Sequence, residues 1–288
     1  MSELAKLISE FQLNDVSATD TYIDGVRFFK STKTIPRMPI MYDPGIIVIA
    51  QGHKVGYLGE RSFRYDSDNY LLVNVTTPFE CATFPEDDEP LLGIYIDIDM
   101  QMLHGLISQV DKKVKNEDVH TLGSAKIDSD LMDAVIRLVK SLKSETESAI
   151  LGQSVLKEIL YRVLSGSQAH LLYALASHDS SFSNIARVVR TIHSNYQEKL
   201  DVDKMASTAG MSTSSFHRAF KEVTSESPMQ YLKKVRLNKA REMMLGERTK
   251  AYAAADSVGY ESVSQFSREF KRYFGQSPAE LIRQSKAI

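Results

Sequence analysis

Two patterns of apolar and polar residues divide the chain near residue 100. Before it, short segments with alternating apolar positions are separated by Gly and Pro, which is typical of β-strands joined by turns. In one of them Ile94, Ile96 and Ile98 share a face. Strands are expected at residues 46–50, 54–58, 62–65, 70–75 and 91–98. This pattern predicts a small antiparallel barrel or sandwich.

After residue 100 the apolar residues recur at spacings of three and four, the period of an amphipathic helix. Helices are expected at residues 100–110, 130–143, 150–164 and 171–176. The expected apolar stripe of the third helix consists of Leu151, Val155, Ile159 and Val163. These helices can pack on the sheet or on a second subunit. The polar run at residues 178–181 predicts a hinge before the rest of the chain.

Length and composition predict a globular protein with two domains. The chain has 288 residues, of which 43% are hydrophobic and 25% are charged, and no apolar run reaches the roughly 18 residues that a membrane span needs. Its first residues lack the pattern of a signal peptide. Cys81, the single cysteine, can form neither an internal disulfide nor a cysteine-based zinc site. We therefore expect a cytoplasmic protein without contact to a membrane.

The net charge of -2 conceals an unequal distribution of charge along the chain. From Ser181 onward there are 18 Lys and Arg against 11 Asp and Glu, whereas the preceding part has 17 basic and 26 acidic residues. A basic C-terminal part suits a polyanionic partner such as nucleic acid. Ordinary fluctuation of charge along a chain is the alternative explanation of this difference.

The C-terminal part contains an internal repeat at a constant offset of 50 residues. The repeated pairs are Ser212 and Ser262, Phe216 and Phe266, Arg218 and Arg268, Phe220 and Phe270, Lys221 and Lys271, and Ser227-Pro228 and Ser277-Pro278. Each copy has the pattern of a helix, a turn with Gly and a second helix, over residues 202–223 and 250–274. The turn after Gly259 is one residue longer than the turn after Gly210. The sequence thus predicts two helix-turn-helix units.

A long helix is expected between the two units, over residues 228–245, because this run begins with proline and is followed by Gly246. Its length of about 27 Å is comparable with the roughly 34 Å between successive turns of one DNA groove. One rigid helix could therefore place two recognition helices about one turn of DNA apart.

The second helix of each unit has an apolar face and a polar, basic face. Residues expected to face outward are Ser214, His217, Arg218 and Lys221 in the first copy, and Ser264, Gln265, Arg268 and Lys271 in the second. Arg can bind guanine, Gln can pair with adenine, and Lys or Ser can hold phosphates. A merely solvated helix face is the alternative, but its repetition within a basic domain favours contact with double-stranded DNA.

These residues resemble the AraC/XylS family of bacterial regulators over residues 183–281. The resemblance rests on Ala206-x-x-Ala209-Gly210-Met211-Ser212, Phe216-x-Arg218-x-Phe220-Lys221, Tyr231-Leu232-x-x-x-Arg236-Leu237-x-x-Ala240 and Val258-Gly259-Tyr260-x-Ser262-x-x-x-Phe266-Ser267-Arg268-x-Phe270-Lys271. It implies an all-α DNA-binding domain of two helix-turn-helix units joined by a long helix. By position, it also implies DNA contacts at the eight outward residues.

Residues 1–180 resemble the cupin-like sensory domain of some members of that family, notably in Tyr42-Asp43-Pro44-Gly45-Ile46, Gln51-Gly52 and Glu158-Ile159-Leu160-Tyr161-Arg162. The resemblance implies an antiparallel β-barrel at about residues 20–99 with accessory helices at about 100–178, and hence an α+β chain. It also implies a small-molecule effector and helices suited to a homodimer. The expected function is a transcription activator, with RNA polymerase as a further partner.

Three residues expected in the barrel interior are candidates for binding a small organic effector: Tyr57, Cys81 and Tyr95. Cys81 is either an inert buried thiol or a sensor that reacts with an electrophile. The alternative function is a cupin-type enzyme attached to DNA, which would need a metal or a nucleophile with its base. Of the histidines at positions 53, 104, 120, 170 and 178, only His53 lies in the strand-rich region, and we expect it to be a turn or surface residue rather than a ligand contact. We therefore expect no catalysis, no metal and no cofactor.

Overall fold

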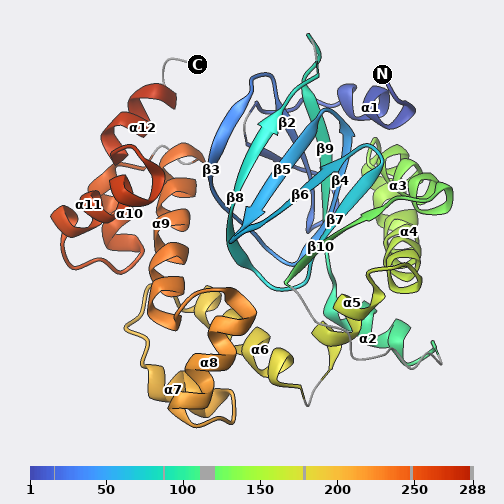
Figure 1. Cartoon of the computed structure of the whole chain (residues 1–288). Helices are drawn as coiled ribbons and strands as arrows, with labels where there is room; N and C mark the ends of the chain where they lie inside the picture. The colour runs from blue at the N-terminus through green and yellow to red at the C-terminus, as the bar shows by residue number, and fades with distance from the viewer. Residues whose placement is uncertain (16, 87, 111–120, 178–179, 247–248, 286–288) are drawn as a thin grey trace. The chain divides into compact units, whose positions relative to one another are not determined.

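A computed structural model describes residues 1–15, 17–86, 88–110, 121–177, 180–246 and 249–285 (Figure 1). The chain forms two compact units. The first, here called the barrel unit, contains almost all described residues up to 177, and the second, the helical unit, contains those from 180 onward. The predicted α+β class, with strands first and tandem helix-turn-helix units last, is confirmed. His120 and His178 lie outside the described residues, and so do residues 178–179 of the predicted hinge at 178–181.

The described strands of the barrel unit belong to one ten-stranded sheet with the order β1-β2-β9-β4-β7-β6-β5-β8-β3, and β10 pairs with β7. Their bounds are β1 Ala18–Asp20, β2 Val26–Ser31, β3 Ile35–Tyr42, β4 Gly45–Gln51, β5 His53–Leu58, β6 Arg61–Asp66, β7 Asn69–Val73, β8 Thr77–Phe84, β9 Leu91–Asp97 and β10 Leu122–Lys126. The sheet rolls into a half-barrel, with every residue of β4 buried at its centre.

The sequence pattern missed β1, β2, β3, β8 and β10. Proline explains two of these omissions, because Pro36 and Pro39 lie in β3 and Pro78 lies in β8. β3 ends the order of strands in the sheet, and an edge strand tolerates residues that donate no backbone hydrogen bond. β10 lies in the region that was predicted to contain only helices, and it pairs with β7 from Leu122↔Val73 to Lys126↔Asn69.

The described helices of the barrel unit are α1 Glu3–Ser9, α2 Met100–Ile107, α3 Ser129–Ser141, α4 Glu145–Ser165 and α5 Ala169–Ala176. The expected stripe of α4 was partly wrong. Val155, Ile159 and Val163 are buried, but Leu151 is 50% exposed and Gly152 takes its place on the buried face. A helical spacing of three or four residues fits Leu151 and Gly152 equally well. Only the packing of the helix on its neighbours decides which of the two is buried.

The described helices of the helical unit are α6 Ser181–Ser194, α7 Val202–Thr208, α8 Thr213–Thr224, α9 Pro228–Gly246, α10 Ala251–Ser257, α11 Val263–Phe274 and α12 Pro278–Ser285. The helix pairs α7–α8 and α10–α11 are the two helix-turn-helix units. α9 joins them and buries Tyr231, Leu237 and Ala240. Its apolar side chains pack with Phe266 and Phe270 of α11 in one core cluster, so α9 is the central support of the second unit.

Candidate DNA interface and effector site

In the first helix-turn-helix, two phenylalanines fix the recognition helix α8. Phe216 and Phe220 are fully buried, with ring centroids 5.4 Å apart, and Phe220 packs edge-on against Tyr231 of α9. Ser212 begins the helix by accepting a hydrogen bond from the backbone amide of Ser215. Gly210, at φ 66°, lets the chain turn before it. The opposite face of α8 is thereby held outward.

All four residues predicted to contact DNA from α8 are exposed: Ser214, His217, Arg218 and Lys221. Among the described residues, no carboxylate forms an ion pair with Arg218 or Lys221. Both cations are therefore available for phosphates or for base edges in a groove.

The second recognition helix, α11, repeats this arrangement. Phe266 and Phe270 are fully buried, and Ser262 caps the helix at the amide of Gln265. The four predicted contact residues Ser264, Gln265, Arg268 and Lys271 are all exposed. In the described chain Arg268 and Lys271 also have no carboxylate as an ion-pair partner.

In the second unit a chain of hydrogen bonds begins at the turn and ends at a predicted contact residue. The hydroxyl of Tyr260 donates to Glu269 over 2.8 Å, and the side-chain amide of Gln265 donates to the other carboxylate oxygen over 3.3 Å. Burial and the Glu269 carboxylate raise the pKa of Tyr260, so its hydroxyl stays protonated and remains a donor. Gln265 is thus oriented before any DNA is bound.

Arg236 of α9 links the two helix-turn-helix units through backbone carbonyls. Its guanidinium donates to Tyr196 and Glu198 in the loop after α6, over 2.7 and 2.8 Å, and to Gly259 in the turn of the second unit, over 3.0 Å. A Cβ at Gly259 would lie 2.2 Å from the carbonyl oxygen of Gln197 in the same loop. The segment before the first unit therefore packs directly on the turn of the second.

The sequence indicated neither this contact nor the Tyr260–Glu269–Gln265 chain of hydrogen bonds. Arg236 and Gly259 belong to two separate family motifs, and neither motif indicates the role of its residue. A glycine before a recognition helix indicates a turn, and nothing in a single sequence shows which backbone approaches it.

In the barrel unit, strand register decides which candidate effector residues face the interior. Gly56 of β5 pairs with Cys81 of β8, and Tyr57 pairs with Glu80. Residues directly opposite share a face and neighbours along a strand alternate, so Cys81 and Tyr57 lie on opposite faces. Tyr57 stacks under the exposed Arg37 guanidinium, 4.2 Å from its ring centroid. The expectation that Tyr57 lines the interior was therefore wrong.

Cys81 and Tyr95 do face the interior. The Cys81 thiol lies 3.3 Å from the Tyr65 hydroxyl, and the Tyr95 hydroxyl donates to the Pro44 carbonyl over 2.9 Å. Cys81 is 3% exposed, and burial raises the pKa of its thiol more than the charge of Lys54 and the bond to Tyr65 lower it. The thiol is protonated near neutral pH, which disfavours reaction with an electrophile.

His53 begins β5, half-buried, with its ring stacked on Phe84 at 4.8 Å between centroids. Burial lowers its pKa, with a further contribution from the Arg64 charge, so the ring is neutral near pH 7. His53 therefore lies at the start of a strand and not in a turn, and its side chain is partly exposed. The described residues contain no cluster of three or more His, Cys, Asp or Glu side chains that could hold a metal ion.

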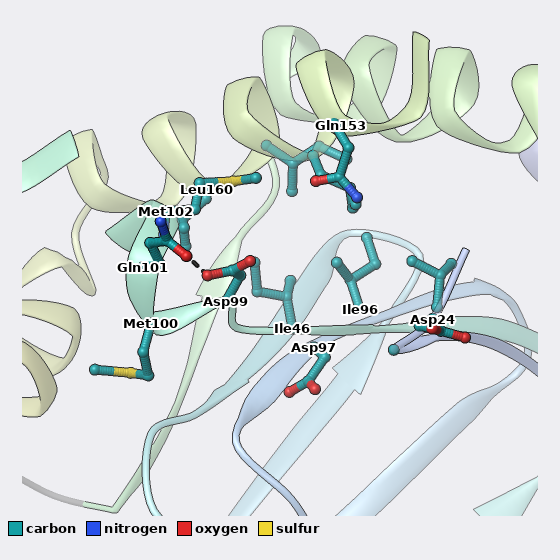
Figure 2. Close-up of a pocket in the computed structure, with 14 residues that line it drawn as sticks. Asp24, Ile46, Ile96, Asp97, Asp99, Met100, Gln101, Met102, Gln153 and Leu160 are labelled. Carbon is teal, nitrogen blue, oxygen red and sulfur yellow. Dashed lines mark hydrogen bonds between the residues drawn. The ribbon is translucent and has the colours of Figure 1, made fainter. Parts of the chain in front are cut away.

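A groove of about 430 Å³ lies between the outer face of the sheet and helices α2 and α4 (Figure 2). Ile46 and Ile96 line it from the sheet, and Gln153 lines it from α4. Its carboxylates are Asp24, Asp97 and Asp99. Burial raises the pKa of Asp97, and the nearby Asp43 and Asp99 charges act in the same direction. This groove is acidic, unlike the barrel interior.

Comparison with known proteins identifies the class of the chain. A family model described as the AraC-type transcriptional regulator N-terminus matches residues 22–171, and one described as a helix-turn-helix domain matches residues 205–284. The first match alone spans more than half of the chain. The protein therefore belongs to the AraC-type transcriptional regulators, and it is a DNA-binding transcription regulator.

Individual relatives agree with this assignment. The Msm operon regulatory protein of Streptococcus mutans is 25% identical over 211 residues, which cover 72% of this chain and 73% of that protein. The RCS-specific transcriptional activator RclR of Escherichia coli is 40% identical over 79 residues, which cover 27% of this chain and 28% of RclR.

The fold also matches a solved structure, ToxT of Vibrio cholerae with a bound unsaturated fatty acid. The TM-score is 0.65 at 14% identity, over 94% of this chain and 97% of ToxT.

In the described part of the chain, no helix is both long and apolar enough to cross a membrane.

Proposed function

We propose that the two recognition helices bind adjacent segments of the major groove, with Ser214, His217, Arg218 and Lys221 contacting one and Ser264, Gln265, Arg268 and Lys271 the other. The observation that carries this proposal is the exposure of all eight side chains on two repeated helices, with four cations that form no ion pair with a described carboxylate. The two sets differ in composition, so a monomer would recognise an asymmetric site. We assign this role to residues 183–281.

Residues 1–180 form, in this proposal, the sensory domain for a small organic effector. Support comes from the interior position of Cys81 and Tyr95 and from ToxT, a neighbour in fold that is described with an unsaturated fatty acid. RclR is named as an activator, which supports activation, and contact with RNA polymerase is part of this proposal. The relatives are regulators, so we propose a cytoplasmic regulator without enzymatic activity.

A homodimer through α4 is part of the proposal, because apolar side chains lie exposed on that helix. Ile150 is 68% exposed, Leu151 50% and Tyr161 43%. Burial of such side chains against a second copy would remove apolar surface from water. Sedimentation of the full chain and of an Ile150→Glu variant tests this: a wild-type protein that remains monomeric at high concentration contradicts it.

Mutation of the two arginines tests the DNA contacts, once genome-wide mapping of bound sites has supplied the operator. Arg218→Ala and Arg268→Ala should each weaken specific binding by about 1 to 3 kcal/mol, because each removes a forked donor from a groove. Binding is measured by fluorescence anisotropy at moderate salt, with mapped and scrambled duplexes.

Lys126→Ala is the charge-matched control, since Lys126 is an exposed cation at the end of β10 in the barrel unit. It should leave specific binding unchanged. If the Arg218→Ala, Arg268→Ala double variant binds the mapped site as tightly as the wild type, the proposed interface is wrong.

A further inference from the structure

Lys54 extends from β5 into the interior of the half-barrel. Its Nζ lies 4.7 Å from the ring centroid of Phe29 on β2, although four strands separate β2 from β5 in the sheet. The same Nζ donates to the hydroxyl of Tyr42 on β3 over 2.9 Å. Contacts with strands that are not its neighbours in the sheet show that the ammonium crosses the interior.

No described carboxylate forms an ion pair with this ammonium, and Tyr42 supplies its one side-chain hydrogen bond within the described chain. Burial alone would lower the pKa of Lys54, but its interactions with Tyr42 and Cys81 outweigh burial and hold the pKa above its ordinary value. Lys54 is therefore a cation at neutral pH. A partly desolvated cation without a counter-ion is unfavourable, and an anion placed beside it would be favourable.

The other interior cation differs in this respect. Arg27 lies over the ring of Tyr95, 4.6 Å from its centroid, and its charge lowers the pKa of Asp97. Arg27 thus has a carboxylate in its electrostatic environment. Among the described residues, Lys54 interacts with hydroxyl, thiol and aromatic groups and with no carboxylate, so it is a cation without a described counter-ion.

Aromatic rings line the interior around Lys54. They lie against glycines, since a Cβ at Gly93 would lie 2.2 Å from the ring of Phe29, and one at Gly56 would lie 2.2 Å from the ring of Phe63. Phe29, Tyr42 and Phe63 are only half-buried in this structure. The rings of Phe29 and Tyr42 flank the ammonium, with centroids 4.7 and 5.6 Å from Nζ.

We propose that Lys54 binds the carboxylate of the effector, and that Phe29 and Tyr42 contact its apolar body. This rests on the proposed function of the barrel as an effector site. A neutral effector would leave the ammonium without a counter-ion, and a cation would be repelled. A Schiff base with an aldehyde would need the neutral amine, which the protonated Lys54 does not provide.

The test uses the full chain with two small carboxylates, phenylacetate and hexanoate, and their neutral primary amides, phenylacetamide and hexanamide. Isothermal titration calorimetry should show each carboxylate binding the wild type roughly 30-fold or more tightly than its amide, because only the carboxylate pairs with the ammonium. Lys54→Met should abolish this preference, and Lys54→Arg should retain part of it.

Two further measurements separate binding from folding. Lys54→Met should melt at the wild-type temperature or above it, because it removes a cation that has no partner. Lys126→Met, which removes an exposed charge from the same unit, should keep the wild-type preference for carboxylates.

The proposal is overturned if Lys54→Met still prefers the carboxylates, if the amides bind wild type equally well, or if neither carboxylate binds at millimolar concentration. Failure of the broader effector function has a different signature: a carboxylate then binds at Lys54 without changing the affinity of the protein for the mapped DNA site.

Discussion

The two helix-turn-helix units repeat at a fixed offset, but their turns have different surroundings. A Cβ at Gly210, in the first turn, would have no described atom within 4 Å. A Cβ at Gly259, in the second turn, would lie 2.2 Å from the Gln197 carbonyl and 3.1 Å from the Arg236 guanidinium. Both glycines have positive φ, so the local backbone is alike and only the tertiary contact differs.

This difference shows how two similar motifs are held in one arrangement. The loop after α6, at the start of the first unit, packs on the second turn, and Arg236 joins the two through three carbonyls. The spacing of the recognition helices therefore depends on the second turn as well as on α9. The first turn takes no part in this contact.

Substitution of the two glycines gives the largest expected difference. Gly210→Ala should destabilise the protein by about 1 to 2 kcal/mol, the cost of a left-handed backbone with a side chain. Gly259→Ala should cost about 1 to 3 kcal/mol more, because its methyl group would overlap a backbone carbonyl. Native-state hydrogen exchange of amides in α8 and α11 measures the local loss, and binding to a bipartite duplex measures the effect on function.

Arg236→Met supplies the internal check on that prediction. Arg236→Met removes the hydrogen bonds that join the second turn to the loop after α6, and Gly259→Ala disturbs the same contact. Their losses in DNA affinity should therefore not add in the double variant. Equal losses from Gly210→Ala and Gly259→Ala would show that the contact with Gln197 is unimportant.

The recognition helices differ as well. In α11, Tyr260 and Glu269 orient Gln265, whereas Ala219 occupies the position of α8 that corresponds to Glu269. Tyr260→Phe should weaken binding to the preferred base at the Gln265 position by about 0.5 to 1.5 kcal/mol, the contribution of one hydrogen bond. Binding to a scrambled duplex should not change. Competition among duplexes that differ at this base pair measures the effect.

Tyr252→Phe is the matched control, because Tyr252 of α10 is 60% exposed and removal of its hydroxyl leaves Gln265 and Glu269 untouched. Gln265→Ala should abolish the effect of Tyr260→Phe. If Tyr260→Phe instead lowers affinity for all duplexes alike, Tyr260 acts on folding and not on the orientation of Gln265.

Local sequence patterns predicted the recognition helices because their causes are local. The phenylalanines at a spacing of four and the capping serines Ser212 and Ser262 were visible in the repeat, and the structure has them in those roles. The contact of Gly259 with Gln197 joins residues 62 positions apart in the sequence and depends on how α6 and α9 pack. No periodicity within one segment contains that information.

Strand register imposed a similar limit on the barrel. Alternation separates Lys54 and Gly56 from Tyr57, but it does not say which of the two faces is the interior. Tyr57 was expected in the interior, but Lys54 lies there instead. The pairing of Gly56 with Cys81 and the contact of Lys54 with Phe29 resolve the choice. Phe29 itself lies in a strand that the alternation did not indicate.

The smallest expected difference in stability between the two helix-turn-helix units lies at the C-terminal ends of their recognition helices. Ser225 directly follows α8 and Gly275 directly follows α11, again 50 residues apart, and both residues are left-handed, at φ 62° and 76°. A serine is strained there and a glycine is not. Ser225→Gly should therefore stabilise the protein by about 0.5 to 1 kcal/mol, and Gly275→Ser should destabilise it by a similar amount.

The two substitutions together report on backbone strain alone. A Cβ at Gly275 would have no described atom within 4 Å, so Gly275→Ser creates no steric overlap. Hydrogen exchange of the last amides of α8 and α11 measures each change, and neither variant should alter affinity for DNA, since both residues lie outside the two predicted contact sets. Destabilisation by Ser225→Gly would mean that the serine side chain supports the end of α8. The two units would then differ at their helix ends as well as at their turns.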